Sequence, residues 1–440
     1  MGLGQRPGIL KRLAAMAPVR VFAISGSESA EIETLLQDPE LEQEIVLTDS
    51  PRSANVLLAM GEFPGSMQES ARRIHDQLSR PRRTLWLRQN VSAPSEAIFP
   101  KAIREDTHCD LALLLRKIHR DLLTGVEPSE EPILPDEEPA LWRGVGPYGQ
   151  GGTGMTGGVP YGRPMAETAP DRDGLALDQL SVRVGPFFRP FPSGLTLALK
   201  LQGDVIQEAA VAENPFDAQK SNPYFESGDS FIRALSEPVP VVEMEMARAR
   251  HHLHWLCNAL QVHGLGALGL RTRAIARSLR PGVVAPIAQL RRILRYSRSV
   301  SLVGAGVGVI QPDKIRDRGL GPVARAAGLR EDLRMTDPAY QELGFEPVVH
   351  AENDVRSRLW QRLDEAMQSV TLAARSGNAT SGGGGRVEGP RGVITLDGNS
   401  LPLLLGLLPD LLYGLEWGDA VATVVSLDLD LRDVRSQRVS

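Results

Sequence analysis

Residues 19–125 alternate between two hydrophobic patterns. Runs rich in β-branched and aromatic residues, typical of strands, are separated by segments with apolar residues at helical spacing. Strands separated by helices of this length predict a parallel α/β sheet, and a mixed α+β unit is the alternative. The predicted strands are Val19–Ser25, Ala54–Met60 and Thr84–Leu87, and the predicted helices are Ser66–Leu78 and Asp110–Leu123.

Residues 126–178 have the composition of a linker. Residues 126–140 hold six acids, four prolines and no basic residue, a composition that buries too little apolar surface to fold. Gly144–Gly162 follows, with nine glycines in nineteen residues. Gly144–Gly149 and Gly149–Gly154 both satisfy GxGxxG, but a dinucleotide fingerprint needs a strand before it and a helix after it. A loop is therefore favoured over a nucleotide site.

Helical periods dominate residues 179–440, with hairpin patterns at the two ends of this segment. We therefore predict an α+β domain with a helical core and small edge sheets. The predicted strands are Leu195–Leu201, Val205–Val211, a hairpin over Val387–Leu396, and Ala420–Leu427; the predicted helices are Val241–Val262, Ala285–Tyr296, Pro312–Ala327, Asn353–Ala374 and Leu403–Leu415.

The composition narrows the possible functions. With 49 basic and 54 acidic side chains, the formal net charge is −5, which does not favour nucleic acid as a partner. Cys109 and Cys257 are the only cysteines. Two thiols cannot supply the four thiolates of an iron–sulfur cluster or of a cysteine-based zinc site, and they exclude a disulfide scaffold. A cytosolic compartment is the simplest interpretation.

Neither end of the chain resembles a targeting or membrane segment. The residues before the first acid, Glu28, are basic but lack the apolar core of a signal peptide. The most apolar stretch, Leu401–Leu415, is shorter than the roughly 18 residues of a membrane span, and two prolines and an aspartate interrupt it. We expect a soluble chain that reaches a membrane through partners or, weakly, through its basic N-terminal arm.

A histidine cluster lies on the predicted long helix. His251 and His254 have the i, i+3 spacing of metal ligands, and His252, Glu243 and Glu245 are close in sequence. No third strong ligand is evident at the required spacing. A structural cluster is therefore favoured over a metal site, with one histidine packed and the others partly exposed.

Two further features have ordinary structural explanations. Asp428 and Asp430 are two residues apart, so they would share one face of the predicted terminal strand. Solvated charges on a strand edge are favoured over a functional carboxylate pair. The glycine-rich run Gly304–Gly308 is favoured as a strand or turn. We recognise no nucleophile elbow, no phosphate loop and no catalytic triad.

Several short motifs occur in a fixed order between residues 180 and 435. They are Gly185–Leu195 with Leu199–Ile206, then Glu245, Arg248 and His252 on the long helix, Gly306–Ile310, Gly319–Gly328 with Arg325, Asp332–Tyr340, Arg386–Gly392 with Arg391, and Leu408–Leu412, Gly418–Val421 and Ser426–Asp428. In this order they resemble the large (49 kDa type) subunit of respiratory complex I and its membrane-bound nickel–iron hydrogenase relatives. The resemblance implies that Glu245, Arg248, His252, Arg325, Arg391 and Asp428 are scaffold positions of that family.

The N-terminal segment resembles a second subunit of the same complexes. The strand within Arg52–Gly61, the helix after it and the strand in Pro81–Leu87 are similar to the small (20 kDa type) subunit. The resemblance implies a fusion of small and large subunits, joined by the acidic linker.

The resemblance also implies ligands that this chain lacks. The cysteines of the family's 4Fe–4S cluster begin after the first strand, where this chain has Ser25-Gly26-Ser27, and the two Cys-x-x-Cys pairs of the hydrogenases are missing. The quinone-site histidines of the family would fall near Phe188 and Ser193, in a loop without histidine. The segment that carries the quinone-contacting tyrosine is shortened, and Tyr224 is a poor substitute.

From the resemblance we expect a peripheral subunit of a complex-I-like (NADH–quinone oxidoreductase or group 4 hydrogenase related) membrane assembly. It would have no catalytic residues, cofactor or metal of its own, and would serve a structural or coupling role beside ion-translocating, antiporter-like subunits at the cytoplasmic face of the inner membrane. The alternative is an oxidoreductase subunit that shapes a quinone or small-molecule pocket, with redox centres on other chains. A free-standing cytosolic protein is a third hypothesis.

Overall fold

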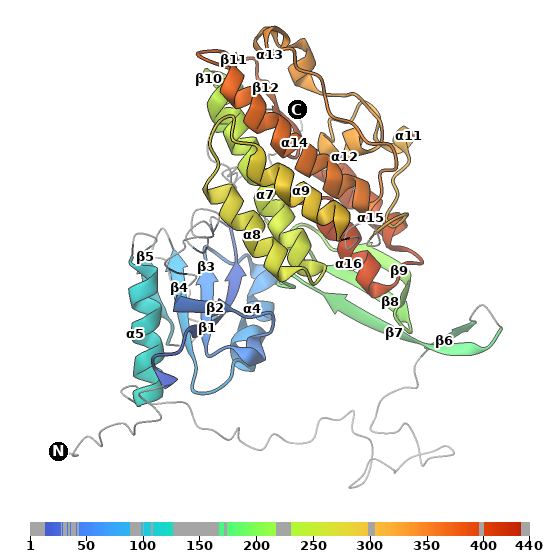
Figure 1. The fold of residues 1–440 in the computed structure, drawn as a ribbon. Helices are drawn as coiled ribbons and strands as arrows, with labels where there is room; N and C mark the ends of the chain where they lie inside the picture. Colours follow the sequence, from blue (N-terminus) through green and yellow to red (C-terminus); the bar gives the residue numbers. More distant parts are fainter. Residues whose placement is uncertain are drawn as a thin grey trace, which may run out of the picture.

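The computed structural model describes residues 14–27, 29, 33, 36, 41, 44–88, 98–99, 101–106, 109–125, 167–170, 174–216, 230–297, 304–395 and 400–432. These residues form an α/β N-terminal part and a C-terminal part with a helical core and small sheets, as the sequence predicts (Figure 1). The acidic segment 126–140, the glycine-rich segment Gly144–Gly162 and Tyr224 lie outside the described residues. No helix among the described residues is long and apolar enough to cross a membrane.

The N-terminal part is a five-stranded sheet in the order β2-β1-β3-β4-β5, and every neighbouring pair is parallel. Alternate residues of the strands face opposite layers, because successive side chains of a strand point to opposite faces. Val56, Leu58 and Met60 of β3 pack in the layer of α5, whereas Leu57 and Ala59 pack in the layer of α4. The predicted parallel α/β sheet is therefore confirmed. Its elements are β1 (Val19–Ser25), β2 (Ile45–Leu47), the 3-10 turn η1 (Pro51–Ser53), β3 (Val56–Met60), α4 (Gly65–Gln77), β4 (Arg83–Arg88), β5 (Ile103–Asp106) and α5 (Leu111–Thr124).

Four helices form the core of the C-terminal part. The long helices α7 and α14 pack along each other, and α8 and α9 cover them in front (Figure 1). The predicted helices at 241–262 and 285–296 are confirmed with their bounds, and that at 353–374 is confirmed with a shift of one or two residues. The four elements are α7 (Val241–Val262), α8 (Gly266–Arg277), α9 (Ala285–Tyr296) and α14 (Val355–Arg375).

An antiparallel sheet in the order β6-β7-β8-β9 lies beside this core. The predicted hairpin around Gly203-Asp204 is its β8–β9 pair, and α15 (Leu401–Leu412) packs on β9. Strand β6 and the start of β7 lie within residues 126–178, where the sequence predicts a linker. The domain limits 19–125 and 179–440 remain predictions. The strands are β6 (Glu167–Pro170), β7 (Ala176–Val184), β8 (Leu197–Gln202) and β9 (Val205–Val211).

Smaller elements complete the C-terminal part. The predicted hairpin at 387–396 is confirmed as the pair β12–β13, and a second small pair joins β10 to β11. The segment Gly304–Gly308 is irregular and turn-like. The remaining elements are α6 (Ser230–Ser236), β10 (Pro238–Pro240), α11 (Pro312–Ile315), α12 (Pro322–Ala326), η4 (Leu333–Thr336), α13 (Pro338–Glu342), β11 (Thr380–Gly382), β12 (Arg386–Gly389), β13 (Gly392–Thr395) and α16 (Trp417–Ser426).

Two predicted elements are wrong. The closing strand predicted at 420–427 is the helix α16, whose Ala420, Val421 and Val424 lie in the main apolar cluster at helical spacing. Packing of that face therefore overrides the strand propensity of its β-branched residues. The single helix predicted at 312–327 is two short helices, because Gly319 and Gly321 between them have φ angles of +66° and +51°.

The two parts of the chain meet at the loop between β7 and β8. The Ser193 hydroxyl donates to the backbone oxygen of Ser25 at the end of β1, and Arg189 pairs with Asp49. Aromatic packing accompanies these contacts, since the rings of Phe187 and Phe63 are 5.7 Å apart. We call this loop, Gly185–Gly194, the junction loop.

Replacing Gly185 by alanine should loosen the junction loop. Gly185 has a φ angle of +108°, and a Cβ atom there would lie 2.0 Å from the backbone oxygen of Leu195. We expect a loss of about 2 kcal/mol or more in the free energy of unfolding, from strained backbone and the clash together. Urea denaturation measures it, with Gly203→Ala as the control, because Gly203 (φ +63°) has open space around it. Equal losses in the two variants would contradict the tight packing of the loop.

Candidate functional site

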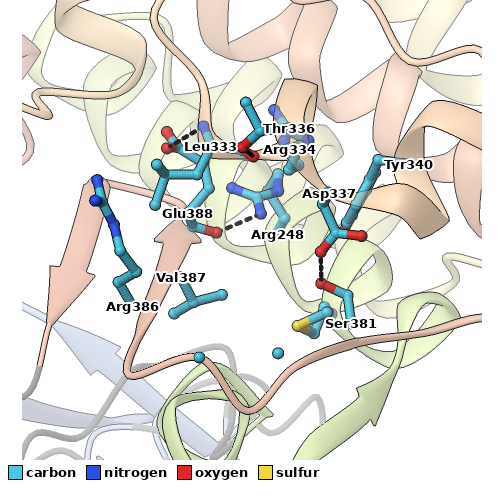
Figure 2. Close-up of a pocket in the computed structure, with 13 residues that line it drawn as sticks. Arg248, Leu333, Arg334, Thr336, Asp337, Tyr340, Ser381, Arg386, Val387 and Glu388 are labelled. Carbon is cyan, nitrogen blue, oxygen red and sulfur yellow. Dashed lines mark hydrogen bonds between the residues drawn. The ribbon is translucent and has the colours of Figure 1, made fainter.

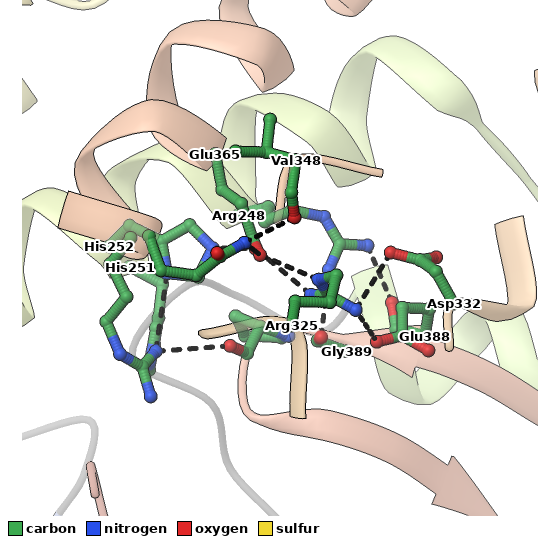
Figure 3. A network of polar contacts seen from close by, with 12 residues as sticks. Arg248, His251, His252, Arg325, Asp332, Val348, Glu365, Glu388 and Gly389 are labelled. Carbon is green, nitrogen blue, oxygen red and sulfur yellow. Dashed lines mark hydrogen bonds and ion pairs between the residues drawn. The ribbon is translucent and has the colours of Figure 1, made fainter. Parts of the chain in front are cut away.

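A network of buried charged side chains runs through the C-terminal part. It contains all six scaffold positions named from the sequence, so the fold brings together residues up to 183 positions apart, from Glu245 to Asp428. Figure 3 shows its centre, where side chains from α7, α12, α14 and β12 converge. Whether these positions carry the family's function remains a prediction.

Glu245 of α7 anchors one end of the network. Its carboxylate accepts from the Tyr340 hydroxyl at 2.7 Å and pairs with Arg248 at 3.2 Å and Arg334 at 3.3 Å. Burial alone would raise the pKa of Glu245, but the two guanidinium groups lower it to about 2. Arg248 also donates to the backbone oxygens of Glu388 and Gly389, and thereby fixes the β12–β13 turn to α7.

Arg325 of α12 is the centre of the network. It is fully buried and bridges three carboxylates: Glu365 at 2.7 Å, Glu388 at 2.8 Å and Asp332 at 2.9 Å. Burial raises the pKa of Glu388, with Asp332 as a further cause, whereas Arg325 holds the pKa of Glu365 well below its usual range despite burial. One arginine thus keeps a cluster of like charges inside the protein.

Two histidines continue the network along α7. The Nε2 atom of His252 lies 3.2 Å from Glu365, and the Nε2 atom of His251 lies 2.7 Å from Asp428. Burial lowers the pKa of His251 to about 4 and that of His252 to about 3. Arg362 lies between them, 3.4 Å from His252 and 3.0 Å from Asp428. Both histidines are therefore neutral near pH 7 and buried, so the prediction of one packed histidine with the others partly exposed is wrong for His252.

The network ends in the N-terminal part. Arg391 lies 3.3 Å from Asp428 and 3.7 Å from Asp430, and Asp430 pairs with Arg432 at 3.1 Å. Arg432 then reaches Glu33, beyond β1, at 2.8 Å. Asp428 and Asp430 were predicted as solvated charges on a strand edge, and this is wrong: both are buried, and arginines hold their pKa values below the usual range.

Some buried donors in the network have no acceptor among the described residues. The Nε and Nη2 atoms of Arg362 and the Nδ1 atom of His251 are buried without a hydrogen bond there. The guanidinium group of Arg362 instead lies 4.8 Å from the centre of the Trp255 ring, a cation–π contact. A cavity of about 30 Å³ is lined by Arg391, Asp428 and Asp430, and is large enough for one or two water molecules.

A polar pocket of about 260 Å³ adjoins the Glu245 end of the network (Figure 2). Its wall combines Arg248, Arg334 and Glu388 from the network with Asp337, which accepts from the Ser381 hydroxyl. Arg386 stands at its edge and is exposed. The pocket suits a small polar molecule, because the buried charges around it balance in sign.

The positions where the family holds its ligands have other roles in this fold. Gly26 packs so closely on the backbone of Glu62 that a Cβ atom would lie 2.0 Å from its oxygen. Phe188 packs edge-on against Phe191, with ring centres 5.0 Å apart, and Ser193 makes the junction hydrogen bond described above. Among the described residues, no three His, Cys, Asp or Glu side chains are placed to hold a metal ion.

Several central residues of the network were not singled out from the sequence as site residues. Arg358, Arg362 and Glu365 recur every three or four positions of α14, and all three are buried. A charged stripe at helical spacing within an otherwise apolar helix face is a signal that could have identified them. Their partners on α7, α12 and β12 could not be inferred from spacing, because they are distant in sequence.

Comparison with known proteins supports a relationship for the C-terminal part. Residues 278–393 match the family described as the 49 kDa subunit of respiratory-chain NADH dehydrogenase. This region includes Arg325, Glu365, Glu388 and Arg391 of the network. The chain therefore carries a 49 kDa-type region of complex I.

Individual relatives match shorter stretches. The D-type subunit of the NADH-quinone oxidoreductase of Dehalococcoides mccartyi is 25% identical over 182 residues, which cover 34% of this chain and 50% of that protein. The D-type subunit from Desulfotalea psychrophila is 35% identical over 80 residues, covering 18% of this chain and 22% of that protein. A C/D-type subunit from Aquifex aeolicus is 42% identical over 69 residues, covering 15% and 12%. The chain thus spans at most half the length of these relatives.

Among solved structures, a chain from the membrane-bound sulfane sulfur reductase, an archaeal respiratory membrane complex, is similar to this protein. The match has a TM-score of 0.43 and 19% sequence identity, and covers 58% of this chain and 98% of the other.

Proposed function

We propose that this protein is a peripheral subunit of a complex-I-like membrane assembly, with no redox centre of its own and a structural or coupling role. It would combine a 20 kDa-type N-terminal part with the 49 kDa-type C-terminal part in one chain. Its partners would be antiporter-like, ion-translocating subunits, and it would lie at the cytoplasmic face of the inner membrane.

The observation that carries this proposal is the junction between the two parts. A 49 kDa-type region is joined to a parallel α/β part through the junction loop, where Phe188 and Ser193 stand at the family's ligand positions. Cys109 lies ahead of α5, and Cys257 lies buried within α7, so the only two thiols belong to different parts of the fold. A four-thiolate cluster cannot be assembled from them.

The coupling role is supported by the path of the network. Paired charges lead from the polar pocket at Tyr340, through Arg325 and Asp428, to Glu33 of the N-terminal part. Each link is buried, so it is weakly screened by solvent and salt. A change of charge or position at one end is therefore felt along a rigid ionic structure rather than being dissipated in water.

The alternative role, an oxidoreductase subunit that shapes a small-molecule pocket, is supported by the pocket of about 260 Å³. In this role redox centres on other chains would act on a molecule bound beside Arg248 and Arg334. The two roles differ in whether this chain contacts a substrate.

One experiment tests the proposal and separates it from the alternatives. We expect the native assembly, captured on this chain from detergent-solubilised membranes, to contain antiporter-like membrane subunits. Iron quantitation and EPR spectroscopy should find no stoichiometric cluster in the purified chain. A cluster in this chain would refute the proposal, and a stable monomer without membrane partners would favour a free-standing protein. Loss of electron transfer in the assembly on Arg386→Gln, at the pocket edge, with Arg375→Gln as the exposed control, would favour the oxidoreductase role.

A further inference from the structure

The charge of the chain is unevenly distributed. Between Glu245 and Asp313, residues 246–312 contain ten arginines and no aspartate, glutamate or lysine, although the whole chain has a formal net charge of −5. This segment forms most of α7 and all of α8 and α9. A strongly basic region therefore lies in an otherwise acidic protein.

Much of this charge is exposed on two neighbouring helices. On α8, Arg271 and Arg277 belong to one exposed stripe, and on α9, Arg292 and Arg295 belong to another. The stripes adjoin, because the Arg271 guanidinium donates to the side chain of Gln289 on α9 at 2.8 Å. Arg280, in the turn between the helices, is also exposed. We call the surface formed by these five arginines the arginine face; α8 and α9 lie side by side at the front of Figure 1.

The charge next to this face is also positive. The half-buried His254 of α7 has a pKa lowered to about 4, first by burial and then by Arg273, Arg277 and Arg250. Carboxylates are few here: Arg291 is the arginine of α9 that pairs with an acid, Asp364, at 2.5 Å. No acceptor among the described residues contacts the guanidinium groups of Arg280, Arg292 and Arg295 closely enough to hydrogen-bond.

Large apolar side chains stand among these arginines. Leu270 on α8, Val283 in the turn and Tyr296 at the end of α9 are 56%, 46% and 78% exposed. Exposed leucine and valine are not unusual singly, but here they share a surface with five unneutralised or weakly neutralised guanidinium groups. Basic residues interleaved with Leu and Tyr are typical of surfaces that lie in the membrane interface.

We propose that the arginine face binds the anionic phospholipid headgroups of a membrane surface. The planar guanidinium fork fits phosphate oxygens in a bidentate manner, which an ammonium group does not do. An acidic protein partner would present donors and acceptors of both kinds, whereas this face offers one sign of charge over its whole extent, as a uniformly anionic bilayer requires. Leu270, Val283 and Tyr296 then enter the headgroup layer.

The size of the effect follows from the number of arginines. Each basic side chain near an anionic bilayer strengthens binding about fivefold, and the attraction falls within a Debye length. Neutralising three of the five should therefore weaken the partition onto anionic vesicles about a hundredfold, and added salt should weaken the wild-type binding.

The test is cosedimentation of the purified full-length chain with protein-free vesicles. We expect binding to phosphatidylglycerol–phosphatidylcholine vesicles and little binding to phosphatidylcholine alone. The triple variant Arg280→Gln, Arg292→Gln, Arg295→Gln should lose binding about a hundredfold. The matched control Arg316→Gln, Arg318→Gln, Arg375→Gln removes the same charge from exposed positions on other elements and should bind like the wild type. Circular dichroism confirms that each variant is folded.

Three outcomes would overturn the inference. They are no binding of the wild type to anionic vesicles, equal loss of binding in the two triple variants, or unchanged vesicle binding in the first variant together with loss of protein subunits from the captured assembly. The last result would assign the arginine face to an acidic protein partner. None of these outcomes depends on whether the chain lacks a redox centre, so failure here is distinguishable from failure of the proposed function.

Discussion

Replacing Arg325 by leucine should unfold the C-terminal part under conditions in which the wild-type chain is folded. The guanidinium group is the shared cation of Glu365, Glu388 and Asp332, at distances of 2.7, 2.8 and 2.9 Å. Without it, three carboxylates would stay in a buried environment with fewer cations than charges. Removing one partner of a buried ion pair costs about 3 to 5 kcal/mol, and here one arginine serves three partners.

The expected loss is therefore at least at the upper end of that range, a large share of the roughly 5 to 15 kcal/mol that stabilises a typical domain. Urea denaturation followed by near-UV circular dichroism measures it. Arg330→Leu is the matched control, because Arg330 pairs with Glu346 on the surface, where an ion pair contributes about 1 kcal/mol or less. If Arg325→Leu does not fold, Arg325→Lys, which keeps the charge but not the fork, should fold with a smaller loss. A loss below 1 kcal/mol in Arg325→Leu would contradict the central role of Arg325.

Acidification from pH 7 to pH 5 should destabilise the protein well before its carboxylates titrate. His251 and His252 have folded-state pKa values of about 4 and about 3, below the unfolded value of about 6.5. Their stabilising effect is complete above pH 6.5, and it is lost as the pH falls toward the folded pKa, because the unfolded chain then binds protons that the folded chain cannot. At about 1.4 kcal/mol per pH unit for each histidine, the loss by pH 5 is about 2 kcal/mol each, or about 4 kcal/mol for the two.

Urea titrations at pH 7, 6 and 5 would measure this decline. His254→Gln should keep most of it, since His254 is less buried than the other two. Stability that stays constant from pH 7 to pH 5.5 would refute the prediction, as would imidazole NMR signals that titrate near pH 6.5 in the folded protein. The lowered pKa of Glu245, about 2, acts in a separate window below pH 4.5.

The sequence was a good guide where local pattern and packing agree. The strand β1 and the helices α7 and α9 have the bounds expected from their periodicity, because each presents its apolar residues to a neighbouring layer at the spacing of its own element. The strand β5, Ile-Arg-Glu-Asp, was missed because nothing in its composition favours a strand; it forms by pairing with β4. The helix α16 was mistaken for a strand because its valines and threonine favour strands, while its packing favours a helix.

The network was harder to foresee than the fold. A resemblance identified Arg325 and Asp428 as scaffold positions, but composition alone favoured solvated charges at Asp428 and Asp430. Their burial depends on Arg362, Arg391 and Arg432, which come from three different segments. Charge pairing across a fold leaves no periodicity in the sequence, so it could not have been inferred from one sequence alone.

Both parts of the junction are on one chain, and this sets the stoichiometry of the pair. Two separate subunits held by Arg189–Asp49, Arg432–Glu33 and a few aromatic contacts would dissociate at low concentration. Within one chain, the same contacts operate at a high effective concentration, because dissociation does not separate the partners. The cell then makes the two parts in equal number, and neither can accumulate without the other. A modest junction is therefore sufficient for permanent association.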